Sequence, residues 1–252
     1  MAACRDHAYA PPETLRGRLY GYAKRMLRRL YPVNLENYYD GFAKNYDEVC
    51  RRQYAYAIPQ KVEEWAVTLA GKNVSLLDLG CGTGLIAKSL KTAGVQGDWW
   101  AIDISQEMLN RAMSQGLYSK SVKWDLNKGL PPIGPHRFSL ITACGCLEFI
   151  RPIKTILKNI ASALDPEGGE VWLTLEKSAP DSPPHGMVDP VTGWTRWHWS
   201  EVQARQLLEQ AGLEIKALID MQAHTNTATG CHVRYFFVVA RRSPGVRASG
   251  AA

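Results

Sequence analysis

Three glycines alternate with other residues in the stretch Leu-Leu-Asp-Leu-Gly-Cys-Gly-Thr-Gly at positions 76–84. An apolar run, an acid and then these glycines are typical of a buried strand, a tight turn and the start of a helix. Glycine has no Cβ and tolerates positive φ, so Gly80, Gly82 and Gly84 allow a ligand to approach the backbone closely. The pattern therefore predicts a ligand-binding loop, and its exact spacing and acid bear on which ligand it suits.

The order of the glycines argues against a dinucleotide. A nicotinamide or flavin site requires Gly-x-Gly-x-x-Gly with the pyrophosphate at a helix N-terminus, and Leu85 stands where the pattern would be completed. The carboxylate of Asp78 would also repel phosphates, whereas it suits a ligand that carries positive charge. No Gly-Lys-Ser/Thr follows the loop, which excludes a P-loop.

A second acidic residue indicates that the ligand contains a ribose. Residues 99–104 read as a strand ending at Asp103, which follows Gly84 by 19 residues. This is close to the spacing at which an acid reaches ribose hydroxyls in a βαβ unit. S-adenosylmethionine combines the required groups, since it has an ammonium, a sulfonium and an adenosine.

Five segments, taken in order, resemble the motifs of the class I S-adenosylmethionine-dependent methyltransferases. The resemblance covers residues 36 to 240, and the segments 45–47 and 116–118 resemble a small-molecule-type subgroup. It implies an α/β fold: a Rossmann-like, doubly wound sheet of seven strands, mainly parallel with an antiparallel last strand, plus an N-terminal helical lid. The motif-like segments are 77–84, 101–105, 124–126, 138–143 followed by Leu147-Glu148, and 164–171.

The hydrophobic pattern along the chain is consistent with that fold. Alternating strands and helices predict a mainly parallel sheet covered on both faces. Ser105 is expected to cap one helix, and Ser200 with Gln203 forms a capping box for another. The expected strands are 74–79, 98–103, 121–124, 138–143, 170–175, 213–220 and 233–240, and the expected helices are 85–93, 105–116, 152–164 and 200–212.

Ligands of open α/β sheets lie outside the carboxyl ends of the strands. By this rule and the resemblance, the glycine loop holds the methionine end, Asp103 the ribose and Asp125 the adenine amino group. Asp103 and Asp125 as ordinary surface acids, and Tyr46 and Met108 as packing residues, are the alternatives. The expected cofactor-binding residues are Tyr46, Asp78, Gly80, Cys81, Gly82, Asp103, Ile104, Met108, Asp125, Leu126 and Cys144.

Methyl transfer requires mainly proximity and orientation, and a general base is needed only if the acceptor is protonated. Aromatic residues in the segment 177–200 suit stacking on a flat acceptor or covering of the sheet edge. The candidate catalytic residues are His198, Glu148 and Glu176, and His185, Asp189, His224 and His232 are further possibilities near the same pocket.

The sequence thus predicts a methyltransferase acting on O, N or C of a small-molecule acceptor. Two alternatives stay open: an enzyme of the lyase or pericyclase type that binds S-adenosylmethionine without transferring methyl, and an RNA or protein methyltransferase. The segment Cys144–Glu148 lacks the Asn/Asp-Pro-Pro-Tyr signature that in this family accompanies methylation of planar amino groups. The oligomeric state is left open.

The net charge of +6 is concentrated near the ends of the chain. Residues 1–30 carry seven basic and two acidic residues and residues 241–252 carry three arginines, so 31–240 holds 20 basic and 22 acidic residues. That balance does not favour a nucleic-acid partner. The basic amphipathic helix expected at 14–30 suits a lid, and it also suits contact with an anionic substrate, RNA or a membrane surface.

Composition predicts a single catalytic domain at 36–242, between a basic extension at 1–35 and a flexible tail at 243–252. The six cysteines include no metal-type Cys-x-x-Cys pair, so we expect free thiols and no metal. No apolar run approaches the roughly 18 residues that span a bilayer, and no signal-peptide pattern opens the chain. We therefore expect a cytoplasmic protein.

Overall fold

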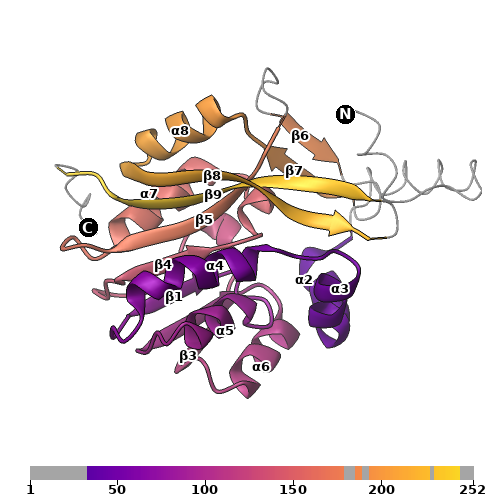
Figure 1. The fold of residues 1–252 in the computed structure, drawn as a ribbon, viewed down its shortest axis with the longest axis horizontal. Helices are drawn as coiled ribbons and strands as arrows, with labels where there is room; N and C mark the ends of the chain where they lie inside the picture. The colour runs from indigo at the N-terminus through magenta and orange to yellow at the C-terminus, as the bar shows by residue number, and fades with distance from the viewer. Residues whose placement is uncertain (1–32, 179–184, 189–192, 228–229, 245–252) are drawn as a thin grey trace, which may run out of the picture.

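A seven-stranded mixed sheet forms the centre of the protein (Figure 1). The computed structural model describes residues 33–178, 185–188, 193–227 and 230–244. The strand order is β3-β2-β1-β4-β5-β9-β8. The strands are β1 (Leu76–Leu79), β2 (Trp99–Asp103), β3 (Lys120–Lys123), β4 (Leu140–Ala143), β5 (Glu170–Glu176), β8 (Leu213–Asn226) and β9 (Cys231–Arg242).

The five strands from β1 to β5 are parallel, and β9 enters antiparallel between β5 and β8. This confirms the expected Rossmann-like fold with an antiparallel last strand. The chain proceeds from β1 outward through β2 to β3 and then returns to β4 on the other side of β1. The order therefore reverses between β1 and β4, and such a switch point is where open α/β sheets bind ligands.

Two buried apolar clusters lie on the two faces of the sheet because its central strands are apolar on both sides. One cluster includes Ile156 and Leu207 from α7 and α8, and the other includes Val62 and Leu90 from α4 and α5. Figure 1 shows the two helix pairs on opposite sides of the sheet. The helices are α4 (Ile58–Ala66), α5 (Leu85–Thr92), α6 (Gln106–Ser114), α7 (Ile153–Ala163) and α8 (Glu201–Gln210).

Ser105 and Ser200 cap α6 and α8 as expected, the second through a full capping box with Gln203. Pro152 is the N-cap of α7 and not its first helical residue. The strand β8 extends to Asn226, beyond the expected end at residue 220, because it pairs along nearly the whole of β9. Long antiparallel pairing of this kind depends on a partner strand that local periodicity does not reveal.

Part of the segment 177–200 forms a small hairpin that the sequence did not predict. Strands β6 (His185–Val188) and β7 (Thr195–His198) pair antiparallel as a separate two-stranded sheet. Asp189 and the prolines of this segment at 180, 183, 184 and 190 lie outside the described residues, as do the expected helix at 14–30 and most of the tail.

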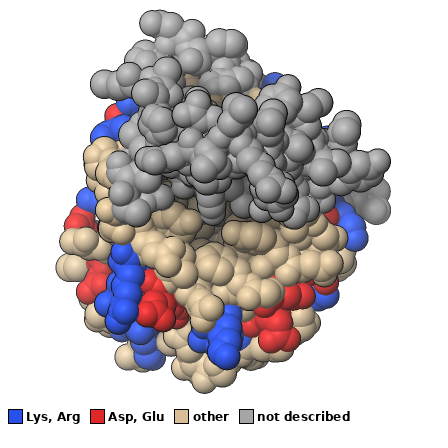
Figure 2. Space-filling view, turned by 90° about the vertical axis from the view of Figure 1, so that its right-hand side faces the viewer, with Lys and Arg blue, Asp and Glu red and all other residues tan. Residues whose placement is uncertain are grey.

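Two short helices precede the sheet, α2 (Leu35–Phe42) and α3 (Tyr46–Arg52), and they lie beside the ends of the strands (Figure 1). On the face that carries them, the described basic and acidic side chains are intermixed and separated by uncharged surface (Figure 2). Within the part of the chain that the structure describes, no helix is long and apolar enough to cross a bilayer.

Candidate functional site

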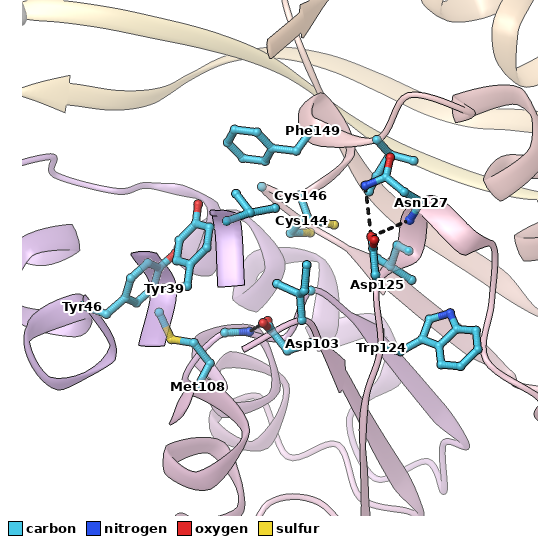
Figure 3. A pocket seen from close by; sticks show the side chains of 17 residues that line it. Tyr39, Tyr46, Asp103, Met108, Trp124, Asp125, Asn127, Cys144, Cys146 and Phe149 are labelled. Carbon is cyan, nitrogen blue, oxygen red and sulfur yellow. Dashed lines mark hydrogen bonds between the residues drawn. The ribbon is translucent and has the colours of Figure 1, made fainter. Parts of the chain in front are cut away.

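A cavity opens at the carboxyl ends of β1, β2 and β4, beside the point where the strand order reverses (Figure 3). Its charged lining residues among those described are Asp103 and Asp125. The residues that line the cavity are Leu35, Tyr39, Tyr46, Gly80, Gly82, Asp103, Ile104, Met108, Trp124, Asp125, Leu126, Asn127, Cys144, Gly145, Cys146, Phe149 and Ile150.

The glycine loop forms one wall in a conformation that other residues would strain. Gly80, Gly82 and Gly84 have φ values of 63°, 55° and 94°, in the region that glycine adopts without steric cost. A Cβ added at Gly80 would lie 2.6 Å from the Cβ of Cys146. The loop therefore keeps its main chain close to the cavity and to the segment after β4.

Asp103 connects the end of β2 to the glycine loop. Its Oδ2 accepts a hydrogen bond of 2.8 Å from the Gly82 N–H, and its Oδ1 accepts one of 2.9 Å from the Ser105 N–H. Burial raises the pKa of Asp103 to about 6, although these two N–H donors favour its ionised form. Each oxygen has a second lone pair, so the carboxylate can accept further hydrogen bonds from a ligand in the cavity.

Asp78 and Cys81 do not line the cavity, in contrast to the other expected cofactor-binding residues. The Asp78 carboxylate accepts hydrogen bonds from the Tyr118 hydroxyl at 2.6 Å and the Thr142 hydroxyl at 2.7 Å. Burial raises the pKa of Asp78 to about 6 as well. Its contacts place Asp78 below the loop, where it ties β1 to β4 and to Tyr118.

Asp125 and Asn127 lie at the far side of the cavity from Tyr46 (Figure 3). Asp125 Oδ1 accepts from the Asn127 N–H at 2.9 Å and from Asn127 Nδ2 at 3.0 Å. Asn127 Oδ1 in turn accepts from the Arg151 N–H at 3.0 Å. These bonds fix the turn after β3 and leave the rest of the Asp125 carboxylate available to a ligand.

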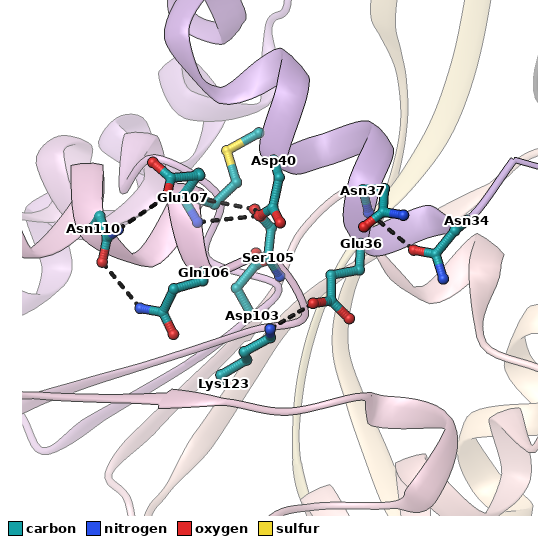
Figure 4. Close-up of polar contacts among 11 residues, drawn as sticks. Asn34, Glu36, Asn37, Asp40, Asp103, Ser105, Gln106, Glu107, Asn110 and Lys123 are labelled. Atoms are coloured by element: carbon teal, nitrogen blue, oxygen red, sulfur yellow. Dashed lines mark hydrogen bonds and ion pairs between the residues drawn. The ribbon is translucent and has the colours of Figure 1, made fainter.

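The lid helix α2 is attached to α6 through Asp40 (Figure 4). Asp40 Oδ1 accepts from the Ser105 hydroxyl at 2.6 Å and from the Glu107 N–H at 3.2 Å. An acid at a helix N-terminus is stabilised by the exposed N–H groups and the helix dipole. A second attachment comes from α3, where Asp47 accepts from the Thr83 hydroxyl at 2.5 Å. These contacts hold Tyr39 and Tyr46 over the cavity.

The three expected catalytic residues, Glu148, Glu176 and His198, converge on Arg196. Arg196 Nη2 lies 2.6 Å from Glu176 Oε2 and 3.8 Å from Glu148 Oε1, and His198 Nδ1 lies 3.3 Å from Glu176 Oε1. The Tyr235 hydroxyl donates to Glu148 Oε1 at 2.6 Å and accepts from Arg196 Nη2 at 3.0 Å. We call these five residues, including Tyr235, the Arg196 cluster.

An aromatic wall continues from the Arg196 cluster toward the cavity. The Tyr56 ring stacks on His224 with centroids 4.7 Å apart, and His224 meets the Tyr235 ring edge-to-face at 5.6 Å. A Cβ added at Gly145, which lines the cavity, would lie 2.9 Å from the Tyr56 hydroxyl. Burial lowers the pKa of His224 to about 3, so its imidazole is neutral at physiological pH.

The remaining candidates for the acceptor side lie away from the Arg196 cluster or outside the described side chains. His232 is exposed and faces Thr225 at 3.3 Å, away from the Arg196 cluster. His185 lies in β6, but its side chain is not among the described ones, and Asp189 is not described. Trp194 packs against Tyr38, Tyr39 and Phe149, so this part of the aromatic segment contacts the lid.

Several lining residues were missed by the sequence reasoning, namely Leu35, Tyr39, Trp124, Asn127, Gly145, Cys146, Phe149 and Ile150. Some carried a signal, since Trp124 lies within a motif-like segment and Asn127 directly follows the same one. Tyr39 lies close to Tyr46 in a stretch that also contains Tyr38 and Phe42, but nothing local distinguishes which of these rings points into the cavity.

Comparison with known proteins matches the part of the chain that builds this site to a family. The model of the family described as "Methyltransferase domain" matches residues 76–168, which contain β1 to β4, α7 and the cavity's glycine loop. The chain carries a class I methyltransferase domain. The ubiquinone biosynthesis O-methyltransferase of Bordetella pertussis is 30% identical to it over 121 residues, 46% of this chain and 48% of that protein. The chain thus matches about half the length of these curated relatives.

Solved structures extend the likeness of the methyltransferase domain to the whole fold. The Burkholderia thailandensis 1,6-didemethyltoxoflavin-N1-methyltransferase, solved with 1,6-didemethyltoxoflavin and S-adenosylhomocysteine, has a TM-score of 0.63 at 18% identity. The match covers 93% of this chain and 92% of that one. The [4+2]-cyclase SpnF also reaches 0.63 at 19% identity, covering 85% and 99%. At these identities the likeness concerns the fold, which hosts more than one chemistry.

Proposed function

We propose that the protein is an S-adenosylmethionine-dependent methyltransferase whose acceptor is a small molecule. The observation that carries the proposal is the Asp103 carboxylate, which the Gly82 and Ser105 N–H groups hold at the cavity beside the glycine loop. A carboxylate in that position suits a pair of ribose hydroxyls. The methyl group of the bound sulfonium is already activated for displacement, so the protein has mainly to orient the two reactants.

The rest of the lining is consistent with an adenosine and a methionine moiety. Ile104 and Met108 offer apolar contacts to a purine, and Asp125 can accept from its amino group. Gly80 and Gly82 present main chain where the methionine portion would lie, and Cys144 and Gly145 stand at the methyl-donor end. Tyr46 closes the cavity from α3. We infer these roles for the domain at residues 36–242.

A small-molecule acceptor is favoured by the form of the site. Residues of α2 and α3 contribute to the cavity wall, and the rings of Tyr39, Tyr46, Trp124 and Phe149 line it, so the acceptor must fit beside the cofactor among aromatic side chains. The charges on the described part of this face are mixed in sign (Figure 2), which does not favour a polyanion. The similar proteins are named for ubiquinone biosynthesis and for methylation of 1,6-didemethyltoxoflavin.

Isothermal titration with S-adenosylmethionine and S-adenosylhomocysteine tests the cofactor. We expect both to bind the wild-type protein and the Asp103→Ala variant to bind them much more weakly. Absence of binding to the wild type would refute the proposal. Incubation with S-adenosylmethionine and candidate acceptors then distinguishes the chemistries: a methyltransferase releases S-adenosylhomocysteine, whereas an enzyme that uses the cofactor only structurally leaves it intact.

A further inference from the structure

The carboxylate of Glu148 is the strongest unexplained feature near the methyl-donor end of the cavity. It lies in the short 3-10 turn Leu147–Phe149 that follows β4, and only 2% of its side chain is exposed. Its Oε1 accepts from the Tyr235 hydroxyl, but Oε2 has no hydrogen-bond partner among the described residues. A buried carboxylate oxygen without a donor is costly, so its retention suggests a partner that arrives with a ligand.

The Glu148 carboxylate does not itself line the cavity, but its charge acts on residues that do. After burial, its charge is the largest contribution that raises the pKa values of Tyr39 and Cys146, both of which line the cavity. It also contributes to raising those of Tyr56 and Cys144. The Glu148 carboxylate therefore lies just behind the lining, between the lid and the segment after β4.

The other two candidate bases are engaged differently. Glu176 lies between Arg196 and His198, at 2.6 Å and 3.3 Å. These contacts make Glu176 the main counter-ion of Arg196, whereas Glu148 stands 3.8 Å from the same guanidinium and keeps one oxygen unengaged. Arg196 in turn lies over the Phe149 ring at 5.6 Å, which fixes the turn that carries Glu148.

The charges around this space indicate the chemical class of the acceptor. The described lining has no lysine or arginine, its two aspartates lie where we infer the ribose and the adenine, and the nearby Arg196 is neutralised by two carboxylates. The described lining therefore offers no cation to pair with an acceptor carboxylate or phosphate. A flat neutral molecule with an O–H or N–H group would instead find the rings of Tyr39 and Phe149 to pack on, and the Glu148 carboxylate behind them to accept its hydrogen.

We propose that Glu148 is a catalytic residue that takes the proton from the methylated oxygen or nitrogen of a neutral, planar acceptor. The proton of the acceptor O–H or N–H passes to Glu148 Oε2. The electron pair left on the acceptor oxygen or nitrogen then forms the bond to the methyl carbon. The carbon–sulfur bond breaks with its electrons returning to sulfur, which gives neutral S-adenosylhomocysteine and the methylated product. This step rests on the proposed methyltransferase function.

The first experiment tests the acceptor class with the full-length protein and radiolabelled S-adenosylmethionine. The probes are neutral planar compounds with a phenolic O–H or ring N–H, such as 4-hydroxyquinoline and lumichrome, beside quinoline-4-carboxylate and benzylamine. We expect methylation among the neutral compounds only. If S-adenosylmethionine binds but the carboxylate or the amine is preferred, or no neutral compound reacts, the inference is wrong while the cofactor assignment stands. If S-adenosylmethionine does not bind, the proposed function itself fails.

The second experiment tests Glu148 with a Glu148→Gln variant, which keeps the shape and an oxygen for Tyr235. We expect kcat to fall by about 10²- to 10⁴-fold, with the affinity for S-adenosylhomocysteine unchanged. The loss should shrink for more acidic phenols and at higher pH, because an acceptor that ionises in solution needs no base. The titratable groups around Glu148 are Tyr39, Tyr56, Cys144, Cys146, Glu176, Arg196 and Tyr235, with His224 packed behind Tyr235, and all are retained in this variant.

Two control variants separate catalysis from structural support. Glu176→Gln removes the main counter-ion of Arg196, so we expect lower stability and a kcat deficit that does not vary with acceptor acidity. Glu214→Gln changes a glutamate of β8 that pairs with Arg241 far from the cavity, and it should leave kcat unchanged. A Glu148→Gln deficit that is equal for all phenols and at every pH, or no deficit, would overturn the role of Glu148.

Discussion

The glycine-loop end of the cavity and the Arg196 cluster are built on different principles. The first consists of turns that follow the four neighbouring parallel strands β1 to β4, and it presents the glycine loop and two aspartates to the cavity. The second takes side chains from β5, β7, β9 and the turn after β4 and places their charges against one another under cover. The first end is thus defined by local backbone geometry, and the second by contacts between segments remote in sequence.

This difference predicts different consequences of mutation. Removing a group from the glycine-loop end should affect ligand affinity more than folding, because that end faces an open cavity. Removing a charge from the Arg196 cluster should affect folding more than affinity for the cofactor, because the partner charges stay buried. The following variants test that separation, in order of expected effect.

The largest effect is expected from Arg196→Met. Loss of the guanidinium leaves Glu148 and Glu176 close together and buried, with side-chain exposures of 2% and 7%. Breaking a buried pair by removing one partner costs about 3–5 kcal/mol, so we expect the free energy of unfolding at pH 8 to fall by about that amount.

Chemical denaturation followed by circular dichroism measures this change. The folded variant should bind S-adenosylhomocysteine as the wild type does. A stable variant with weakened cofactor binding would contradict the separation of the two regions.

The next effect is expected from Asp103→Ala at the glycine-loop end. Hydrogen bonds to a charged group contribute about 1.5–3 kcal/mol each, so losing the acceptor for two ribose hydroxyls should weaken S-adenosylhomocysteine binding by at least about 100-fold. Isothermal titration measures the affinity. Asp125→Ala is the matched variant at the adenine side, where we expect a smaller loss, and equal losses would argue against a ribose at Asp103.

The sequence predicts the glycine-loop end better than the Arg196 cluster, because the first depends on local backbone geometry and the second on contacts between remote segments. The order Gly80, Gly82, Gly84 and the acid at Asp103 lie within one βαβ unit, so their spacing alone indicates which main-chain atoms meet the ligand. Glu148 and Glu176 were identified as candidates because each follows an expected strand, and His198 because it lies in the aromatic segment 177–200. Their convergence on Arg196 depends on the β6–β7 hairpin and on the pairing of β9 with β5, neither of which is encoded in a local pattern.

The pH dependence of cofactor binding distinguishes two buried acids at the glycine-loop end, Asp103 and Asp78. Burial raises the pKa of Asp103 to about 6 in the free protein, and hydroxyl donors of a ligand would favour its ionised form and lower that pKa again. Affinity for S-adenosylhomocysteine should therefore be constant above pH 7 and fall below pH 6, by up to about tenfold per pH unit.

Titration calorimetry between pH 5 and 8 measures this slope, and Asp103→Asn should abolish it. Asp78 provides the matched control, because burial raises its pKa to about 6 as well, but it does not line the cavity. We expect Asp78→Asn to keep the slope. Loss of the slope in that variant would instead mean that Asp78 acts on the charged part of the ligand, as the sequence first indicated.

The smallest effect is expected at the lid, which contacts both regions through one helix. Tyr39 of α2 lines the cavity and also experiences the charges of Glu148 and Arg196, while Asp40 attaches the helix to the start of α6. Asp40→Ala removes an acceptor at a helix N-terminus, so we expect a loss of about 1 kcal/mol in stability and a several-fold weaker affinity for S-adenosylhomocysteine.

Glu36→Ala on the same helix is the matched control, because the Glu36–Lys123 ion pair is substantially exposed and such pairs contribute little. Thermal unfolding with and without S-adenosylhomocysteine measures both quantities. If Asp40→Ala lowers stability without changing affinity, the lid is not needed to hold the cofactor. Its position beside Glu148 would then bear on the acceptor alone, and kcat rather than cofactor affinity should respond to the loss of the Asp40 carboxylate.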